Sequence, residues 1–272
     1  FQLPYYMEFE VFKEKYQHKS VVEYPNRVID KPAVSVCVPT YQHVAYIQEC
    51  LDSIIKQKTT FPFEIIVGED NSTDGTREIC IKYANRYPTK IRLLLHNKEN
   101  KVSVLGKTTG GFNNLYNFYS AKGKYIARCE GDDYWTDIYK LQKQFDFMEA
   151  NPNYFVCGHD AFIAGESGIV KMSKLPDSQK RDLSSDQNKY GGFILTMSIF
   201  FRNPNFYPFE ILNVINFDTF LTSYLLQFGN YKFLKNIEPA CYRIHEGGLW
   251  SSSEHTFKQL SEFNTLYWLT RY

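Results

Sequence analysis

Short apolar segments alternate with amphipathic ones between residues 34 and 129, and this alternation limits the folds open to the chain. The apolar segments are strand-like runs bounded by turn residues: Val34–Val38, Phe63–Val67, Ile91–Leu95 and Tyr125–Cys129. Between the first two, Ile47, Leu51 and Ile54 recur at helical spacing. Because a strand that returns to its sheet through a helix runs parallel to its predecessor, we expect an α/β fold with a mixed, mainly parallel sheet flanked by helices.

Carboxylates cluster directly after two of the predicted strands. The second strand is followed by Glu69 and Asp70, and the fourth by Glu130, Asp132 and Asp133. Three like charges within four positions repel one another unless a cation binds them, and oxygen ligands suit Mg²⁺ or Mn²⁺. A solvated acidic turn is the alternative interpretation. Since open α/β sheets bind ligands beyond the carboxyl ends of their strands, we expect a metal-supported site at this edge.

Some classes of function are disfavoured by what the sequence lacks. No Gly-x-Gly-x-x-Gly or Gly-x-x-x-x-Gly-Lys-Ser/Thr motif follows a predicted strand, which argues against dinucleotide oxidoreductases and P-loop ATPases. A nucleotidyltransferase remains an alternative, although the glycine-rich basic loop expected of it is missing at residues 39–42. The formal net charge is +1, so no overall field favours nucleic acid as a partner.

The cysteines indicate a reducing compartment. The six cysteines are Cys37, Cys50, Cys80, Cys129, Cys157 and Cys241. They show no Cys-x-x-Cys spacing, and four of the six lie in strand-like runs. Buried, reduced thiols are therefore expected, which predicts a cytoplasmic protein. No apolar run approaches membrane-spanning length, while peripheral attachment to the inner face of the membrane stays open.

Three regions are expected along the chain. Residues 1–31 form an N-terminal extension, residues 32–252 the main domain, and residues 253–272 a C-terminal amphipathic helix. The aromatic face of that helix suits packing, a homodimer contact or a membrane surface.

Four ordered motifs resemble those of the family 2 glycosyltransferases with the GT-A fold, of the bacterial inverting type. The motifs are Val36–Tyr41, Glu69–Thr76, Cys129–Thr136 and Tyr242–Ser251. The resemblance implies an inverting enzyme that moves a sugar from a nucleotide diphosphate sugar, with a UDP-sugar favoured, to a hydroxyl of a saccharide or lipid-linked acceptor. Members of this type make bacterial polysaccharide, lipopolysaccharide or glycoconjugates.

The resemblance also implies which residues bind the nucleotide. Thr40 and Tyr41 would lie beside it, and Asp70 would accept hydrogen bonds from its base. Glu130 would contact the ribose, and Asp132 would complete the nucleotide site. Glu69 departs from the more usual Asp, which leaves the choice of base open, and Thr40 could instead be a simple helix cap.

A divalent metal ion is implied at the same place. Its ligands would be Asp132, Asp133 and His245, a mixed set that leans toward Mn²⁺ without excluding Mg²⁺. A lone histidine is more often structural than a ligand, so a structural role for His245 is the alternative.

The catalytic base and the acceptor contacts come from the second half of the chain. The resemblance makes Asp218 the base, although its place just before a predicted helix at 220–228 fits an N-cap equally well. Trp135, Arg202 and Trp250 are expected to contact the acceptor, while core packing explains the tryptophans almost as well. A non-catalytic module of the same fold, binding a sugar nucleotide or a partner, is the competing function.

Overall fold

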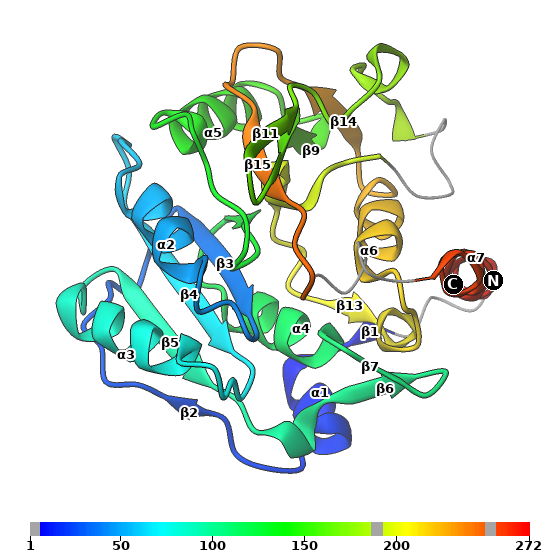
Figure 1. Ribbon diagram of the computed structural model, residues 1–272. Coiled ribbons are helices and arrows are strands. Elements are labelled where there is room, and N and C mark those ends of the chain that lie inside the picture. Colours follow the sequence, from blue (N-terminus) through cyan, green and yellow to red (C-terminus); the bar gives the residue numbers. More distant parts are fainter. Residues whose placement is uncertain (1–5, 186–192, 248–253) are drawn as a thin grey trace.

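An eight-stranded sheet forms the centre of the computed structural model, which describes residues 6–185, 193–247 and 254–272 (Figure 1). Its strands, in spatial order, are β14 (Asn230–Phe233), β9 (Tyr154–Gly158), β12 (Phe200–Arg202), β8 (Tyr125–Arg128), β3 (Val34–Thr40), β4 (Phe63–Glu69), β5 (Ile91–Leu95) and β2 (Val22–Glu23). β12 and β2 run antiparallel to their neighbours, and the other adjacent pairs are parallel. The prediction of a mixed, mainly parallel sheet is confirmed.

Helices cover this sheet. They are α1 (Phe9–Tyr16), α2 (Ile47–Ile55), α3 (Thr76–Arg86), α4 (Gly111–Ser120), α5 (Lys140–Ala150), α6 (Phe217–Leu225) and α7 (His255–Leu269). Every residue of β3 and β4 is buried, which is the pattern of parallel strands packed on both faces. The six cysteines are free and buried, as the sequence predicts.

A smaller sheet lies beside the carboxyl end of β8. It consists of β11 (Gly168–Lys171), β10 (Ala161–Gly165) and β15 (Ala240–Arg243), with β15 parallel to β10. Tyr134 pairs with Cys241 in an isolated antiparallel bridge. This bridge brings the segment after β15 against the acidic turn that follows β8. Two further pairs are β6 (Val102–Val104) with β7 (Lys107–Thr109), and β1 (Tyr6–Met7) with β13 (Tyr207–Pro208).

Both end segments pack on the central layers. In the N-terminal segment, α1 buries Phe12 against Phe112, and β2 adds an edge strand to the main sheet. In the C-terminal segment, α7 contacts α6 and buries Ser261 and Thr265, while Phe263 stays 71% exposed. We therefore propose that the domain includes both end segments. None of the described helices combines the length and apolar character needed to cross a bilayer.

Candidate functional site

The predicted site residues gather at one edge of the sheet because β3, β4 and β8 are parallel and nearly in register. Thr40 at the end of β3 pairs with Glu69 at the end of β4. On the other side of β3, Cys37 pairs with Arg128, which ends β8. The acidic turn at residues 130–133 therefore lies beside the end of β3, where Thr40 stands. Asp70 follows the end of β4, the neighbouring strand on the other side.

Asp132 lies between two imidazoles. Its Oδ2 is 3.1 Å from Nε2 of His245 and 3.8 Å from Nε2 of His43. The three side chains each offer one ligand atom within 4.8 Å of the others. His43 is not among the residues chosen from the sequence, where a histidine three positions after Thr40 carries no motif. The structure holds it near the site through a 3.2 Å hydrogen bond between its Nδ1 and the Thr40 hydroxyl.

A second ligand group shares Asp132 and adds Glu130 and Asp133, again with ligand atoms within 4.8 Å. Asp133 is 1% exposed, and its Oδ1 accepts a 3.0 Å hydrogen bond from the backbone N–H of Arg243. Among the described residues, neither Oδ1 of Asp132 nor Oδ2 of Asp133 has a hydrogen-bond partner, although both atoms are buried. Unpaired carboxylate oxygens beside imidazole nitrogens fit a divalent cation such as Mn²⁺ or Mg²⁺.

Burial and neighbouring charges shift the pKa values of the three carboxylates in the acidic turn. Burial raises the pKa of Glu130 to about 8, and the charges of Asp218 and Asp132 act in the same direction. Burial and the charge of Asp132 raise the pKa of Asp133 well above its usual range. Burial alone would also raise the pKa of Asp132, but the hydrogen bond with His245 and the charge of His43 lower it. The pKa of Asp132 therefore lies below its usual value, whereas those of Glu130 and Asp133 lie above theirs.

Gly131 is required by close approach of the backbone to β3. A Cβ atom at this position would lie 2.4 Å from Oγ1 of Thr40 and 2.8 Å from Nδ1 of His43. Both distances are shorter than van der Waals contact, so a side chain here would displace the pair that holds His43. The glycine therefore lets the acidic turn close on the end of β3.

A second group of side chains, Asp70, Lys101 and Tyr41, gathers near the ends of β3 and β4. Nζ of Lys101 is 3.6 Å from Oδ2 of Asp70 and 3.3 Å from the ring centroid of Tyr41. Burial raises the pKa of Asp70 to about 6, although the charge of Lys101 opposes the shift. Tyr41 is 44% exposed, so its ring stays accessible. Lys101 was not predicted from the sequence, because it comes from a loop without a motif.

Glu69 has a structural role here. Its carboxylate is buried, accepts a hydrogen bond from the guanidinium of Arg77, and accepts another from the backbone N–H of Ser72 at 2.6 Å. These bonds fix the turn after β4. Both bonds need the longer reach of a glutamate, which explains why Glu and not Asp stands at this position. Asp70 is left as the acid that contacts Lys101.

Asp218 stands in the first turn of α6, whose N-cap is Asn216, so the N-cap interpretation of Asp218 is wrong. Its Oδ1 accepts a hydrogen bond from Arg128, and its Oδ2 accepts one from the Thr196 hydroxyl at 2.8 Å. The Asp218 side chain is 43% exposed. Arg128 also lies 3.6 Å from Glu130, which places Asp218 next to the acidic turn.

Two of the residues expected to contact the acceptor require correction. Trp135 is 4% exposed, its Nε1 donates to the Met197 carbonyl, and Nζ of Lys140 covers its ring at 4.1 Å. It is therefore mainly a core residue, although a small part of it lines the groove described next. Arg202 pairs with Tyr125 at the start of β8, the end of the strand away from the acidic turn, and bonds to backbone carbonyls there. Trp250 lies outside the described residues.

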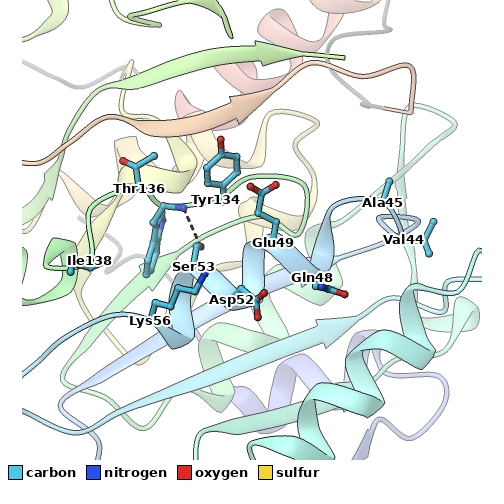
Figure 2. A pocket seen from close by; sticks show the side chains of 11 residues that line it. Val44, Ala45, Gln48, Glu49, Asp52, Ser53, Lys56, Tyr134, Thr136 and Ile138 are labelled. Atoms are coloured by element: carbon cyan, nitrogen blue, oxygen red, sulfur yellow. Dashed lines mark hydrogen bonds between the residues drawn. The ribbon is translucent and has the colours of Figure 1, made fainter. Parts of the chain in front are cut away.

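A shallow groove of about 660 Å³ runs beside the site between α2 and the segment after the acidic turn (Figure 2). Glu49 and Tyr134 project into it from these two elements. Glu49 also forms an ion pair with Arg243, whose guanidinium donates to the Asp132 carbonyl at 3.1 Å. The groove is thus physically connected to the acidic turn.

Two solved structures have the same architecture. The TarS 1–349 complex of S. aureus with UDP-GlcNAc superimposes with a TM-score of 0.58 and 23% identity, over 81% of this chain and 61% of that one. The mannosyltransferase PcManGT of Pyrobaculum calidifontis, solved with GDP-Man and Mn²⁺, gives a TM-score of 0.57 and 14% identity, over 93% and 69%. The likeness shows that the fold is GT-A.

Sequence comparison identifies relatives and the family. An uncharacterized protein of Mycobacterium tuberculosis is 35% identical over 220 residues, which are 81% of this chain and 61% of that protein. Hyaluronan synthase of Pasteurella multocida is 30% identical over 221 residues, 80% of this chain and 20% of the synthase. The chain thus spans less than two thirds of the length of these curated relatives. Because the model described as glycosyl transferase family 2 matches residues 35–206, the chain belongs to that family.

Proposed function

We propose that this chain is a metal-dependent, inverting glycosyltransferase that moves a sugar from a nucleotide diphosphate sugar to an acceptor hydroxyl. The observation that carries the proposal is the meeting of Asp132 with His245 and His43, beside buried carboxylate oxygens that have no hydrogen-bond partner within the described part of the chain. Family membership supports it. Further support comes from the two structural neighbours, which were solved with UDP-GlcNAc and with GDP-Man and Mn²⁺.

The pair of Asp70 and Lys101 is proposed to bind the base. The two side chains set a hydrogen-bond acceptor next to a donor, 3.6 Å apart. The pair matches an N–H that lies beside an acceptor: a ring N–H beside a carbonyl oxygen in uracil, thymine and guanine, and an amino group beside a ring nitrogen in cytosine and adenine. The pair therefore does not choose among the bases by itself, and the UDP-GlcNAc complex of the structural neighbour is what supports uracil. We favour a UDP-sugar, with Tyr41 stacking on the base.

The chemical step is proposed to use residues on both sides of the acidic turn. Asp132, Asp133 and His245, together with His43, would hold the metal, and Glu130 would contact the ribose. When bound, the metal supplies Lewis-acid stabilisation of the charge on the leaving diphosphate. Asp218 takes the proton of the acceptor hydroxyl, whose oxygen bonds to the anomeric carbon as the bond to the diphosphate oxygen breaks. One such displacement inverts the configuration at that carbon.

The acceptor is proposed to be a saccharide or a lipid-linked hydroxyl compound in bacterial polysaccharide, lipopolysaccharide or glycoconjugate synthesis. The similarity to hyaluronan synthase, a polysaccharide-forming relative by name, supports this class. The groove lined by Glu49 and Tyr134 offers polar and aromatic groups next to the acidic turn. Such groups suit a sugar chain, and the groove, which Trp135 also lines, replaces Arg202 in the proposal.

A thermal-shift panel tests the nucleotide site. UDP, GDP, CDP and dTDP, each with and without Mn²⁺, are added to the wild type and to Asp132→Asn. A nucleotide at about one hundred times its dissociation constant should add roughly 2.7 kcal/mol of apparent stability. We expect UDP with Mn²⁺ to stabilise the wild type, with the response lost in the variant. No response to any nucleotide would contradict the proposal.

The non-catalytic module is separated from the enzyme by Asp218→Asn. If the chain transfers sugar, this variant should bind UDP with Mn²⁺ as the wild type does while transfer falls by about 10²- to 10⁴-fold. Nucleotide binding in a wild type that transfers nothing to any saccharide acceptor would favour the module.

A further inference from the structure

A buried guanidinium stands behind Asp218. Arg128 ends β8 and is 1% exposed, so it cannot touch a substrate. Its two terminal nitrogens donate to Oδ1 of Asp218 and, at 2.7 Å, to Oδ1 of Asn114. The rings of Phe118 and Phe217 flank the guanidinium, with centroids 5.6 and 5.7 Å from its central carbon. The group is therefore held in one orientation by two hydrogen bonds and two aromatic rings.

Two side chains of the protein hold the Asp218 carboxylate, and part of this carboxylate still faces solvent. Oδ1 accepts from Arg128 and Oδ2 accepts from Thr196, while the side chain remains 43% exposed. A carboxylate has room for about four hydrogen bonds, so lone pairs remain for a hydroxyl that arrives from solvent. This geometry suits a group that must receive a proton from outside.

Glu130 is the second carboxylate near Arg128, and it is the weaker partner. Its Oε1 lies 3.6 Å from the guanidinium, beyond ordinary hydrogen-bond length. Asn114 keeps the guanidinium turned toward α6, since its own amide is anchored to the Gly110 carbonyl at 3.0 Å. Arg128 therefore acts mainly on Asp218.

We propose that Arg128 is a positioning residue for sugar transfer, which keeps the Asp218 carboxylate aimed at the acceptor hydroxyl. The inference rests on the proposed function, because Asp218 is the proposed base. It assigns a role to the last residue of β8, which no motif identified. The planar guanidinium holds its two terminal nitrogens at a fixed separation, one donating to Asp218 and the other to Asn114. A lysine ammonium does not reproduce this fixed geometry.

The test is a double-mutant cycle on transfer from the donor that the nucleotide panel identifies. Arg128→Met should lower kcat by about 30-fold or more and change the donor KM by less than about threefold, because the base loses its alignment for the chemical step while the donor site is unchanged. Arg128→Lys should recover part of kcat. In the Asp218→Asn background, Arg128→Met should cost no further activity, because both changes remove the same function.

Arg202 provides the matched control. Like Arg128, it is an arginine at the end of a strand, and its guanidinium donates to backbone carbonyls. It pairs with Tyr125 at the start of β8, whereas Arg128 ends that strand. Arg202→Met should lower Tm without lowering kcat per folded molecule. An Arg128→Met enzyme with wild-type kcat, or one whose defect multiplies fully with that of Asp218→Asn, would overturn the inference. A wild type that binds UDP but transfers nothing would instead refute the proposed function, and the inference would fall with it.

Discussion

Nζ of Lys101 lies 3.6 Å from Oδ2 of Asp70. The sequence motif predicts Asp70 as a site residue, whereas Lys101 comes from a loop that carries no motif. Burial outweighs the nearby charge, so the pKa of Asp70 rises from 3.8 to about 6. The proposed base site therefore contains a group whose pKa lies near 6, with two consequences that can be measured.

The first concerns stability in the absence of ligand. Because the folded protein binds this proton more tightly than the unfolded chain does, the contribution of Asp70 is fully present below about pH 4 and is lost as the pH rises through 6. The loss amounts to about 3 kcal/mol for a shift of this size. Asp70→Asn should remove this decline in denaturant unfolding measured from pH 4 to pH 7. Asp30→Asn, at a position with a 93% exposed side chain, should leave the decline unchanged.

The second consequence concerns Lys101. Its charge lowers the pKa of Asp70, so Lys101→Met should move the midpoint of the decline in stability above pH 6. The same variant should weaken UDP binding by about tenfold, the effect of one lost hydrogen bond to a charged group. Isothermal titration calorimetry with UDP and Mn²⁺ measures it. A variant that binds UDP like the wild type would show that Lys101 does not contact the base.

Lys140 gives a pH dependence of the opposite sign. It is fully buried, its Nζ donates to Oε1 of Gln144 at 2.6 Å, and burial lowers its pKa from 10.5 to about 7. The unfolded chain binds this proton more tightly, so stability rises as the pH increases from 7 to 10. Lys140→Met should be the more stable protein at pH 7, and its advantage should shrink by about 3 kcal/mol by pH 10.

Gly131 tests the closure of the acidic turn. Gly131→Ala would push a methyl group into Thr40 and His43, which should cost about 1–3 kcal/mol of stability and abolish the Mn²⁺-dependent response to UDP. Gly110→Ala is the matched control, because its nearest contact would be 3.4 Å from an Asn114 side chain. Calorimetric melting of both variants, with and without UDP and Mn²⁺, separates the two effects. Retention of the full UDP response in Gly131→Ala would contradict this account of the turn.

His43 tests the ligand set. If it binds the metal together with Asp132 and His245, His43→Gln should weaken Mn²⁺ binding by about 10- to 100-fold, a loss typical of changes near a metal. Electron paramagnetic resonance of free Mn²⁺ measures the change directly, without activity. His18→Gln, at an exposed position, should bind Mn²⁺ as the wild type does. Equal affinity in both variants would limit His43 to supporting Thr40.

The sequence was most informative where hydrophobic periodicity and strand ends decide the structure. The alternation from Val34 to Cys129 correctly predicts the parallel core, because buried strands and amphipathic helices leave a strong local pattern. The acidic turn was correctly placed at the carboxyl edge for the same reason. His43, Lys101 and Arg128 were missed, since each becomes part of the site through contacts between distant segments and not through a local pattern.

The errors have a common cause. Trp135 and Arg202 were chosen because their side chains are suited to binding sugars or anions, but burial decides whether such a group is available. Trp135 is covered by Lys140, and Arg202 bonds the Tyr154 and Met148 carbonyls at the wrong end of its strand. Residue type alone therefore cannot distinguish an acceptor contact from a core contact.

The contact between His245 and Asp132 joins two points that are 113 residues apart in the chain. A ligand that needs both side chains can bind only while the segment after β15 is docked against the first half of the domain. Ligand binding and docking of this segment are then thermodynamically linked. The bound ligand stabilises the docked segment as a reversible crosslink between two distant parts of the chain would. The concentration of that ligand, and not the local packing alone, would set how often the end of the domain detaches and becomes open to proteolysis.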